Sequence, residues 1–273
     1  MLGSLGPAAR FDLHMHSNRS DGRFEPEEVL RRAARGGLDV IALTDHDLPT
    51  ALAPGPRQVE GRTLHLVAGA EVSATHEGHE YHLLVYFAGE VPAGFRAFCA
   101  EQCKERVDRY EATRTTLSIE GLPAPSAAAR QGEQALTRHH LARSMVEQGH
   151  ATSVADAFAR HLSHRHGKVR KMSMPYVEAI RLARDHGGIT SWAHPPMEGL
   201  RAVPAFAKAG LHALEAWRPP VSGSDRRRLR RLARDHGLFL TGGSDWHGWG
   251  DPDHLGLFAV ERRELNDFCE ALS

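Results

Sequence analysis

The stretch PEEVLRRAARGGLDVIALTDHD, residues 26–47, contains the pattern that decides the fold. It begins with an amphipathic segment, continues through two glycines, and ends in a short apolar run followed by polar residues. A glycine after a helix is typical of the left-handed C-terminal cap, and a continuous apolar run is typical of a buried parallel strand. The stretch therefore predicts a helix, a tight turn and a strand that ends in polar residues at 44–47.

The same layout recurs three more times along the chain. It is found at residues 177–195, 203–217 and 227–247, and the heptapeptide RLARDHG occurs at both 181–187 and 231–237. Repeated alternation of helices and strands predicts an α/β fold with a parallel sheet and helical crossovers. In barrels of this kind the functional residues lie at the carboxyl ends of the strands.

Residues 96–170 depart from this pattern. They contain helical stretches such as FRAFCAEQCKERVDRYEATRTTL, which begins at residue 95, and TRHHLARSMVEQG at 137–149. Between these stretches no run is as apolar as the strands of the flanks. We therefore expect a barrel domain made of residues 1–95 and 171–273, and a helical insertion, or cap, made of residues 96–170.

The composition excludes several classes of protein. The 273 residues include 34 basic and 34 acidic side chains, so the formal net charge is zero and long nucleic acid cannot be held by bulk charge. No apolar run reaches the roughly 18 residues of a membrane span. The first ten residues, MLGSLGPAAR, contain no apolar core of signal-peptide length, which favours a cytoplasmic location.

The three cysteines also bear on the class of protein. Cys99, Cys103 and Cys269 form an odd set, which makes a disulfide framework unexpected. Cys99 and Cys103 lie one helical turn apart, and we expect reduced thiols on a helix rather than a pair of metal ligands.

The chain contains 19 histidines, and several of them fall where strands should end. His14 and His16 form an HxH pair, and on a strand residues i and i+2 face the same side, so both imidazoles can reach one ion. The other candidate ligands are Asp21 in a turn, His46, Glu71 in GAEVS, His82, His194, Asp245 and His247. His79 is an alternative to His82, and His76 is less favoured because it falls in an expected loop. Buried histidines that are simply hydrogen-bonded within the core would account for one or two of these residues, but not for all of them.

The order of these motifs resembles that of the polymerase and histidinol phosphatase (PHP) family of metal-dependent phosphoesterases. The motifs are HxH, the Asp of SDG, TDHD, GxE, a later strand His, AHP and GSDxH. The resemblance implies a distorted (β/α)7 barrel that holds up to three divalent ions. Within the insertion, TRHHLARSMVEQGHATSVADAFARHL followed by GK resembles the subgroup that hydrolyses nucleoside 3′,5′-bisphosphates and the 5′ ends of short RNAs.

Carried onto this sequence, the resemblance implies three metal sites. The first would be held by His14, His16, Glu71 and Asp245; the second by the bridging Glu71 with His82 and His194; the third by Asp21, His46 and His247. Imidazole and carboxylate ligands without thiolate suit Mn²⁺, Fe²⁺ or Zn²⁺. A hydroxide bridging two ions would attack phosphorus, since metal binding lowers the pKa of water to about 7. Asp45 is expected either to orient a ligand or assist proton transfer, or to be only a turn or cap carboxylate.

Substrate contacts are expected from the insertion. Arg138 and His140, in the TRxH pattern, and Lys168, in GK, would bind a phosphate that is not transferred, because arginine binds phosphate bidentately and lysine supplies a point charge. The alternative is a solvated helix face, and His139 is easily confused with His140. Glu215 ends an expected strand, where a structural hydrogen bond is favoured over contact with substrate.

The expected activity is release of the 3′-phosphate from nucleoside 3′,5′-bisphosphates, and trimming of short RNAs from the 5′ end. The partner would then be a nucleotide or a short oligoribonucleotide. Two alternatives stay open. One is a small-molecule phosphatase of the histidinol-phosphate type, and the other is a metal-binding scaffold without catalysis.

Overall fold

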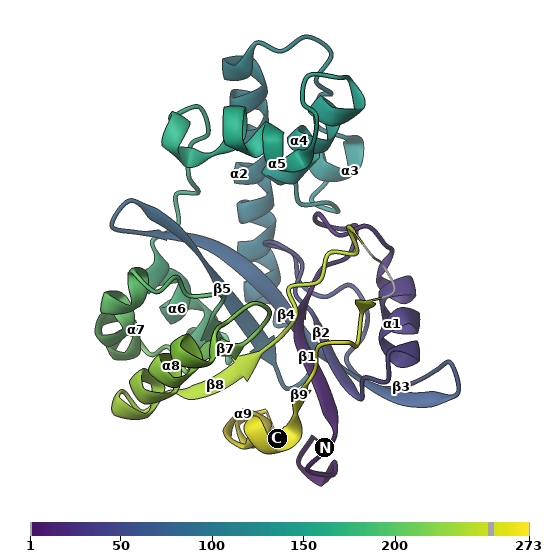
Figure 1. Ribbon diagram of the computed structural model, residues 1–273, viewed down its shortest axis with the longest axis vertical. Coiled ribbons are helices and arrows are strands. Elements are labelled where there is room, and N and C mark those ends of the chain that lie inside the picture. The colour runs from purple at the N-terminus through teal and green to yellow at the C-terminus, as the bar shows by residue number, and fades with distance from the viewer. Residues whose placement is uncertain (1, 251–253, 273) are drawn as a thin grey trace.

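A computed structural model describes residues 2–250 and 254–272 (Figure 1). Within these residues, nine strands form one sheet in the order β8-β7-β6-β5-β4-β2-β1-β9, with β3 beside β4. The strands are β1 (Arg10–Met15), β2 (Val40–Leu43), β3 (Gly55–Val59), β4 (Arg62–His76), β5 (His79–Phe87), β6 (Ile189–Trp192), β7 (Ala213–Trp217), β8 (Phe239–Gly242) and β9 (Val260–Glu261).

Helices surround this sheet and extend beyond one of its ends. They are α1 (Pro26–Arg35), α2 (Ala93–Leu117), α3 (Ala127–Arg130), α4 (Arg138–Glu147), α5 (Val154–Ala157), α6 (Tyr176–Asp185), α7 (Val203–Ala209), α8 (Gly223–Asp235) and α9 (Asn266–Ala271). Short helical turns are η1 (Leu2–Ser4), η2 (Phe158–Leu162), η3 (His164–His166), η4 (Gly199–Ala202) and η6 (Arg262–Glu264). The α/β barrel-like fold expected from the sequence is thereby confirmed.

The four expected turns between helix and strand all contain a left-handed glycine. After α1, α6, α7 and α8 the φ angles are +75° at Gly37, +75° at Gly187, +100° at Gly210 and +66° at Gly237. Residues with a Cβ pay a steric cost in this region, and glycine does not. The repeated heptapeptide folds the same way twice, because Gly188 and Leu238 each donate a backbone hydrogen bond five residues back, at 2.8 Å.

The sheet is nearly closed into a barrel because the segment after β8 returns to β1. Met15 forms a parallel bridge with Trp246, and the backbone N–H of Asp245 donates to the carbonyl of His14 at 2.8 Å. Gly243 allows this approach, since a Cβ there would lie 2.4 Å from the backbone nitrogen of His14. The closure brings the GSDWH segment beside the HxH pair.

The hairpin β4–β5 departs from the expected parallel order. β4 pairs in parallel with β2, but β5 is antiparallel to both β4 and β6. Glu71 therefore lies in the middle of a strand, opposite Leu84, rather than at its end. The apolar run LHLVAGAE, which suggested an end at Glu71, is part of a longer strand, and the face opposite Glu71 contributes Val72 and Ala74 to the core.

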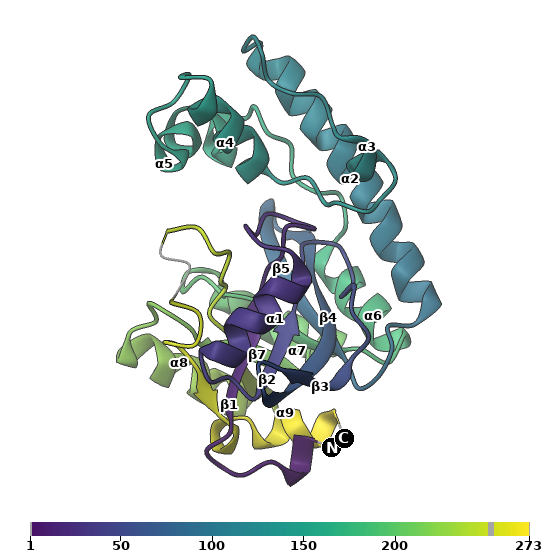
Figure 2. The same cartoon turned by 90° about the vertical axis from the view of Figure 1, so that its right-hand side faces the viewer.

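Helix α2 joins the barrel to the following helices. It begins at Ala93, slightly before the expected boundary at residue 96. Its first turns place Phe95 and Cys99 in the barrel core, while Tyr110 belongs to a separate hydrophobic cluster with Leu141 and Met145 of α4. Figures 1 and 2 show α4, α5 and the far end of α2 beyond one end of the barrel, opposite the termini.

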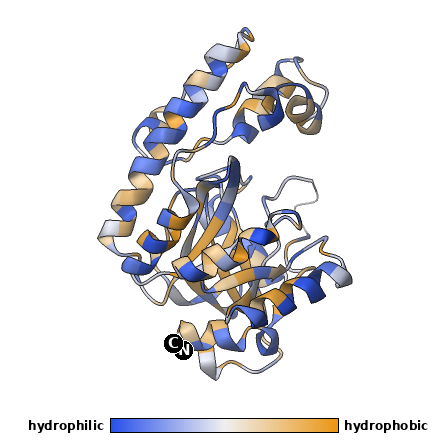
Figure 3. Ribbon diagram, turned by 90° about the vertical axis from the view of Figure 1, so that its left-hand side faces the viewer, coloured by the Kyte–Doolittle hydropathy of each residue, from blue (hydrophilic) through white to orange (hydrophobic). Residues whose placement is uncertain are grey.

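The distribution of hydropathy agrees with this architecture. In Figure 3 the central strands are mostly hydrophobic, and the helices around them alternate hydrophobic and hydrophilic residues. Cys99, Cys103 and Cys269 are all buried. Among the described residues, no helix has both the length and the apolar character needed to cross a membrane.

Candidate metal centre

The carboxylate of Glu71 is the centre of a cluster of imidazoles. Five ring nitrogens surround it: Nε2 of His14 at 3.3 Å, Nε2 of His16 at 3.3 Å, Nδ1 of His46 at 2.9 Å, Nδ1 of His82 at 3.0 Å and Nε2 of His194 at 3.1 Å. These side chains come from four strand regions and the loops after them. The mid-strand position of Glu71 is what lets one carboxylate reach all five.

Two further carboxylates complete the cluster. Asp245 Oδ1 lies 3.4 Å from His14 Nε2 and 3.3 Å from His16 Nε2. Asp21 Oδ1 lies 3.2 Å from His247 Nε2, and Asp21 Oδ2 lies 3.6 Å from His46 Nε2. All nine side chains singled out in the sequence are thus gathered at one place.

Three groups of donor atoms within this cluster are close enough to hold an ion. They are His14, His16 and Asp245; His46, Glu71 and His82; and His16, Asp21, His46 and His247, with donor atoms within 4.8 Å of one another. His16 and His46 each belong to two groups, and His194 reaches the second through its 3.1 Å contact with Glu71. The distribution of ligands over three ions remains a prediction.

The cluster fits divalent cations by an independent criterion. Five buried donor atoms form no hydrogen bond of acceptable geometry, although they lie close to other donor atoms of the cluster: His14 Nε2, His16 Nε2, His46 Nδ1, Asp21 Oδ1 and Glu71 Oε2. Buried polar atoms are normally hydrogen-bonded, so orphaned atoms that face one another need another partner. A set of nitrogen and oxygen atoms without sulfur is suited to divalent first-row metal ions.

The alternatives to His82 lie away from this cluster. His79 pairs with His76 at the tip of the β4–β5 hairpin, and the ring of His76 packs against Phe206 with centroids 4.8 Å apart. His82, three residues further along β5, contacts Glu71 directly. The geometry therefore favours His82 as the ligand.

The centre is closed on one side and open on the other. The side chains of His14, His16 and Glu71 are fully buried, whereas Asp245 is 40% exposed and His194 is 30% exposed. His247 and His82, at 25% and 20% exposed, belong to the same open side. Asp245 and His194 have left-handed backbones, with φ of +55° at Asp245 and +31° at His194, which costs on the order of 1 kcal/mol each.

Residues outside the cluster hold the ligands in place. Glu215 accepts a hydrogen bond from the backbone N–H of His194 at 2.7 Å, and its other oxygen lies 2.9 Å from His14 Nδ1. A carboxylate on the far nitrogen of a metal-ligating histidine fixes the ring and its tautomer. The structural role expected for Glu215 is thus confirmed.

Asp45 acts on the loop that carries Asp21 rather than on the cluster itself. Its carboxylate accepts hydrogen bonds from the N–H and hydroxyl of Ser17, at 2.8 and 2.7 Å, and from the hydroxyl of Ser20 at 2.7 Å. Of the roles expected for Asp45, these contacts agree with that of a carboxylate that stabilises a turn. Through Ser20, whose hydroxyl is 3.4 Å from His16 Nδ1, Asp45 also reaches one ligand indirectly.

The pKa values in the metal-free protein reflect this crowding. Burial lowers the pKa of His14, but the carboxylates of Glu71, Glu215 and Asp245 more than offset it and hold the pKa well above its ordinary value. His247 behaves similarly beside Asp21, which raises its pKa to about 10 against the effect of burial. Burial and the neighbouring His247 lower the pKa of His16 to about 4. The carboxylates of Asp21 and Glu71 titrate well below their usual pKa despite burial, because histidines surround them.

Metal binding should therefore release protons. A ligating imidazole must be neutral, yet at pH 7 His247, with a pKa of about 10 in the metal-free protein, carries a proton. The apparent metal affinity should rise as pH rises toward 10 and fall below pH 7. Calorimetric titration of the metal-free protein with Mn²⁺, in buffers of different ionisation enthalpy, measures the protons released. Binding with no proton release at pH 7 would contradict the charge assigned to His247.

The three residues expected to bind substrate have different surroundings. His140 caps α4 through its Nδ1, which accepts from the N–H of Thr137 at 3.1 Å, and it lines a cavity of 390 Å³ beside Asp21. Arg138 donates weakly to the carbonyl of Leu162 at 3.5 Å, and burial lowers its pKa to about 10. Lys168 is exposed after η3. Neither Arg138 nor Lys168 lines that cavity.

Residues 12–149 match the PHP domain, a span of about half the chain. The chain belongs to the PHP family. It is 33% identical over 251 residues to the 5'-3' exoribonuclease Rnm of Escherichia coli, covering 88% of this chain and 86% of that protein. It is 27% identical to the 3',5'-nucleoside bisphosphate phosphatase of Chromobacterium violaceum, covering 89% of each.

A solved structure extends the likeness to the whole fold. A candidate metal-dependent phosphoesterase of Bifidobacterium adolescentis superimposes with a TM-score of 0.77 at 25% identity, covering 98% of both chains. Together with the family match and the clustered donor atoms, this identifies the chain as a metal-dependent phosphoesterase of the PHP family, and so as a hydrolase.

Proposed function

We propose that this PHP phosphoesterase releases the 3′-phosphate from nucleoside 3′,5′-bisphosphates and also trims short RNAs from their 5′ ends. The observation that carries the proposal is the cavity of 390 Å³ that joins the metal centre, at Asp21, to His140 of the insertion. Its size is within the range of small-molecule sites. Both named relatives act on nucleotides or RNA, which supports the same substrate class.

Nine side chains are proposed to hold two or three divalent ions, with Mn²⁺, Fe²⁺ and Zn²⁺ as candidates. They are His14, His16, Asp21, His46, Glu71, His82, His194, Asp245 and His247. When bound, such ions neutralise the charge on phosphoryl oxygens and lower the pKa of water. The chain itself fixes His14 through Glu215, keeps the buried side of the centre away from water, and leaves the phosphoryl group to enter from the cavity at Asp21.

Residues 96–170 are proposed to form the cap that recognises the rest of the substrate. The cluster around Tyr110, Leu141 and Met145 gives this segment a core of its own, which supports the division, and residues 1–95 and 171–273 are proposed to form the barrel. In this reading Arg138, His140 and Lys168 meet the phosphate that is not transferred. One site then serves both activities, because that second phosphate can be terminal or part of a diester.

The proposal is tested by phosphate release from adenosine 3′,5′-bisphosphate by Mn²⁺-loaded protein, with AMP and histidinol phosphate alongside. We expect rapid release from the bisphosphate and little from the other two, followed by 5′-end trimming of short RNAs. Preference for histidinol phosphate would replace the proposal by the small-molecule alternative. If the metal-loaded protein releases no phosphate from any of the three substrates, the result would favour the non-catalytic scaffold.

Arg138→Ala should raise KM for the bisphosphate about ten- to a hundredfold, the value of a charge-assisted hydrogen bond, with a smaller effect on kcat. Arg165→Ala, which removes an exposed arginine of the same insertion, is the matched control. Thermal melts of both variants exclude a folding effect. If Arg138→Ala keeps the full preference for bisphosphate over monophosphate, Arg138 does not bind the second phosphate.

A further inference from the structure

We propose that Trp249 and Arg143 together form a platform that binds the nucleobase of the substrate by stacking. The two side chains stack directly on each other in the lining of the cavity beside the metal centre, one from the barrel and one from the insertion. The choice of a nucleotide as ligand rests on the proposed function. The platform itself rests on the geometry of these two residues.

Trp249 is an exposed aromatic side chain fixed beside a candidate metal ligand. It is 38% exposed, whereas most other large hydrophobic side chains are covered. Its indole Nε1 donates to the backbone carbonyl of Asp21 at 2.7 Å, and the carboxylate of Asp21 belongs to the metal centre. A ring held this way binds at little entropic cost, because its orientation is set before the ligand arrives.

Arg143 supplies the second layer of the platform. Its guanidinium carbon lies 3.9 Å from the centroid of the Trp249 ring, and the side chain is also tied to Glu147 at 3.0 Å. A guanidinium in this position is a flat cation on an aromatic face. Nucleobases stack on both aromatic rings and guanidinium planes. His139, one helical turn before Arg143, lies 5.3 Å from the Trp249 ring and closes the same wall.

The surroundings indicate how selective this platform is. The cavity is lined by Trp249 and Arg143 together with Asp21, His140 and Tyr110. Stacking does not read the hydrogen-bonding edge of a base, so it accepts purines and pyrimidines alike. We therefore expect this wall to recognise nucleotides without preference among bases.

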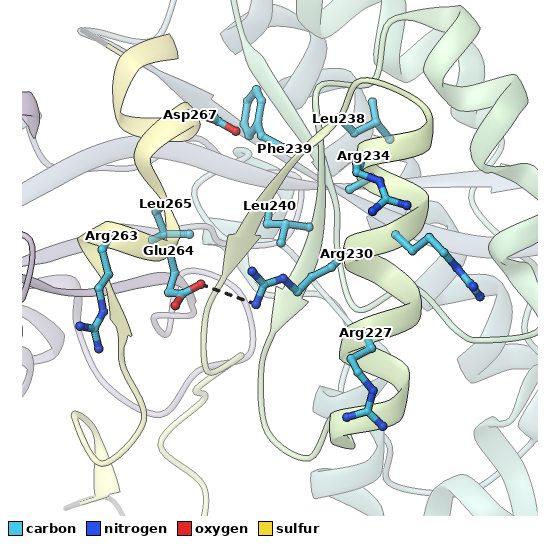
Figure 4. A pocket seen from close by; sticks show the side chains of 12 residues that line it. Arg227, Arg230, Arg234, Leu238, Phe239, Leu240, Arg263, Glu264, Leu265 and Asp267 are labelled. Atoms are coloured by element: carbon cyan, nitrogen blue, oxygen red, sulfur yellow. Dashed lines mark ion pairs between the residues drawn. The ribbon is translucent and has the colours of Figure 1, made fainter.

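A second arginine-rich cavity offers an internal comparison. It has a volume of 640 Å³, lies between α8 and the η6–α9 segment, and is lined by Arg227, Arg230 and Arg234 of α8 and by Arg263 and Glu264; Figure 4 shows Arg230 pointing toward Glu264. Arg230 and Glu264 are 3.9 Å apart. No candidate metal ligand found among the described residues lines this cavity. It is therefore a site where an arginine can be removed without touching the metal centre or the platform.

The test compares binding of AMP and ribose 5-phosphate to the Mn²⁺-loaded protein by calorimetry. The two probes share the ribose and the 5′-phosphate and differ only by the base. We expect the wild type to prefer AMP about 5- to 150-fold, the range for stacking one base. Trp249→Ala should reduce this ratio to about one by weakening AMP alone. Trp249→Phe should retain much of it, and Arg227→Ala should leave it unchanged.

Arg143 needs a pair of variants to separate stacking from charge. Arg143→Ala and Arg143→Lys should both lower the AMP preference, because lysine restores the charge but not the plane. Full rescue by Arg143→Lys would overturn the stacking role of Arg143. The proposed platform would be wrong if Trp249→Ala kept the wild-type ratio of AMP to ribose 5-phosphate affinity, or if it lost affinity for both probes equally. If the wild type prefers AMP through Trp249 yet releases no phosphate from the bisphosphate, the platform stands and the proposed function fails.

Discussion

Glu71→Gln should lower the rate of phosphate ester hydrolysis more than about a hundredfold. Loss of a residue that only supports a metal ligand typically costs 10–100-fold in activity or metal affinity, and Glu71 is in direct contact with the donor atoms. Its carboxylate lies within 3.3 Å of five imidazole nitrogens. A neutral amide of the same shape removes the charge that a cation needs and turns an N–H donor toward rings that should bind metal.

Metal content and turnover should therefore fall together in this variant. The measurements are the metal-to-protein ratio after dialysis and the rate of phosphate release at saturating substrate. Glu215→Gln is the matched control, because Glu215 contacts His14 only through the nitrogen that faces away from Glu71. The loss of activity in Glu215→Gln should be about 10- to 100-fold. A Glu71→Gln protein with full metal content and turnover would show that Glu71 is not a ligand.

The clustering of the nine candidate ligands could be predicted from the sequence because several of them follow apolar strands. His46, His194, Asp245 and His247 come soon after such runs, and parallel strands end at one side of a barrel. Glu71 was found for a reason that was partly wrong. The apolar run LHLVAGAE suggested that the strand ends at Glu71, but the strand continues to His76 and Glu71 is buried within it.

Contacts between the insertion and the barrel could not be predicted from the sequence. Asp47 could be taken for a cap because it follows a strand, and nothing in the pattern links it to Arg106, which lies 59 positions later in α2. Trp249 was missed for a similar reason, since an aromatic residue in a glycine-containing loop has no periodicity. Its partner Arg143 was one of many arginines. Such pairs depend on how two segments dock, which local patterns do not encode.

Arg106→Met should destabilise the protein by about 3–5 kcal/mol, the cost of leaving one partner of a buried ion pair without the other. Arg106 Nε lies 2.6 Å from Asp47 Oδ2, and the two side chains are 4% and 0% exposed. Arg106 also donates to the hydroxyl of Ser73 at 2.7 Å and to the carbonyl of Leu136 at 3.1 Å. One side chain of α2 thus connects β4, the loop at Asp47 and the segment that leads into α4.

Urea denaturation with a matched variant on the same helix measures this effect. Arg96→Met removes an arginine from a pair with Glu90 in which both side chains are largely exposed, and it should cost no more than about 1 kcal/mol. The double variant Asp47→Asn with Arg106→Met removes both charges and should recover part of the loss. Asparagine suits position 47 because it tolerates the left-handed backbone, with φ of +50°, and can still accept from the N–H of Ser73. If Arg106→Met costs no more than Arg96→Met, the buried pair is not what fastens the insertion to the barrel. The platform of Trp249 and Arg143 would then need another explanation for its alignment.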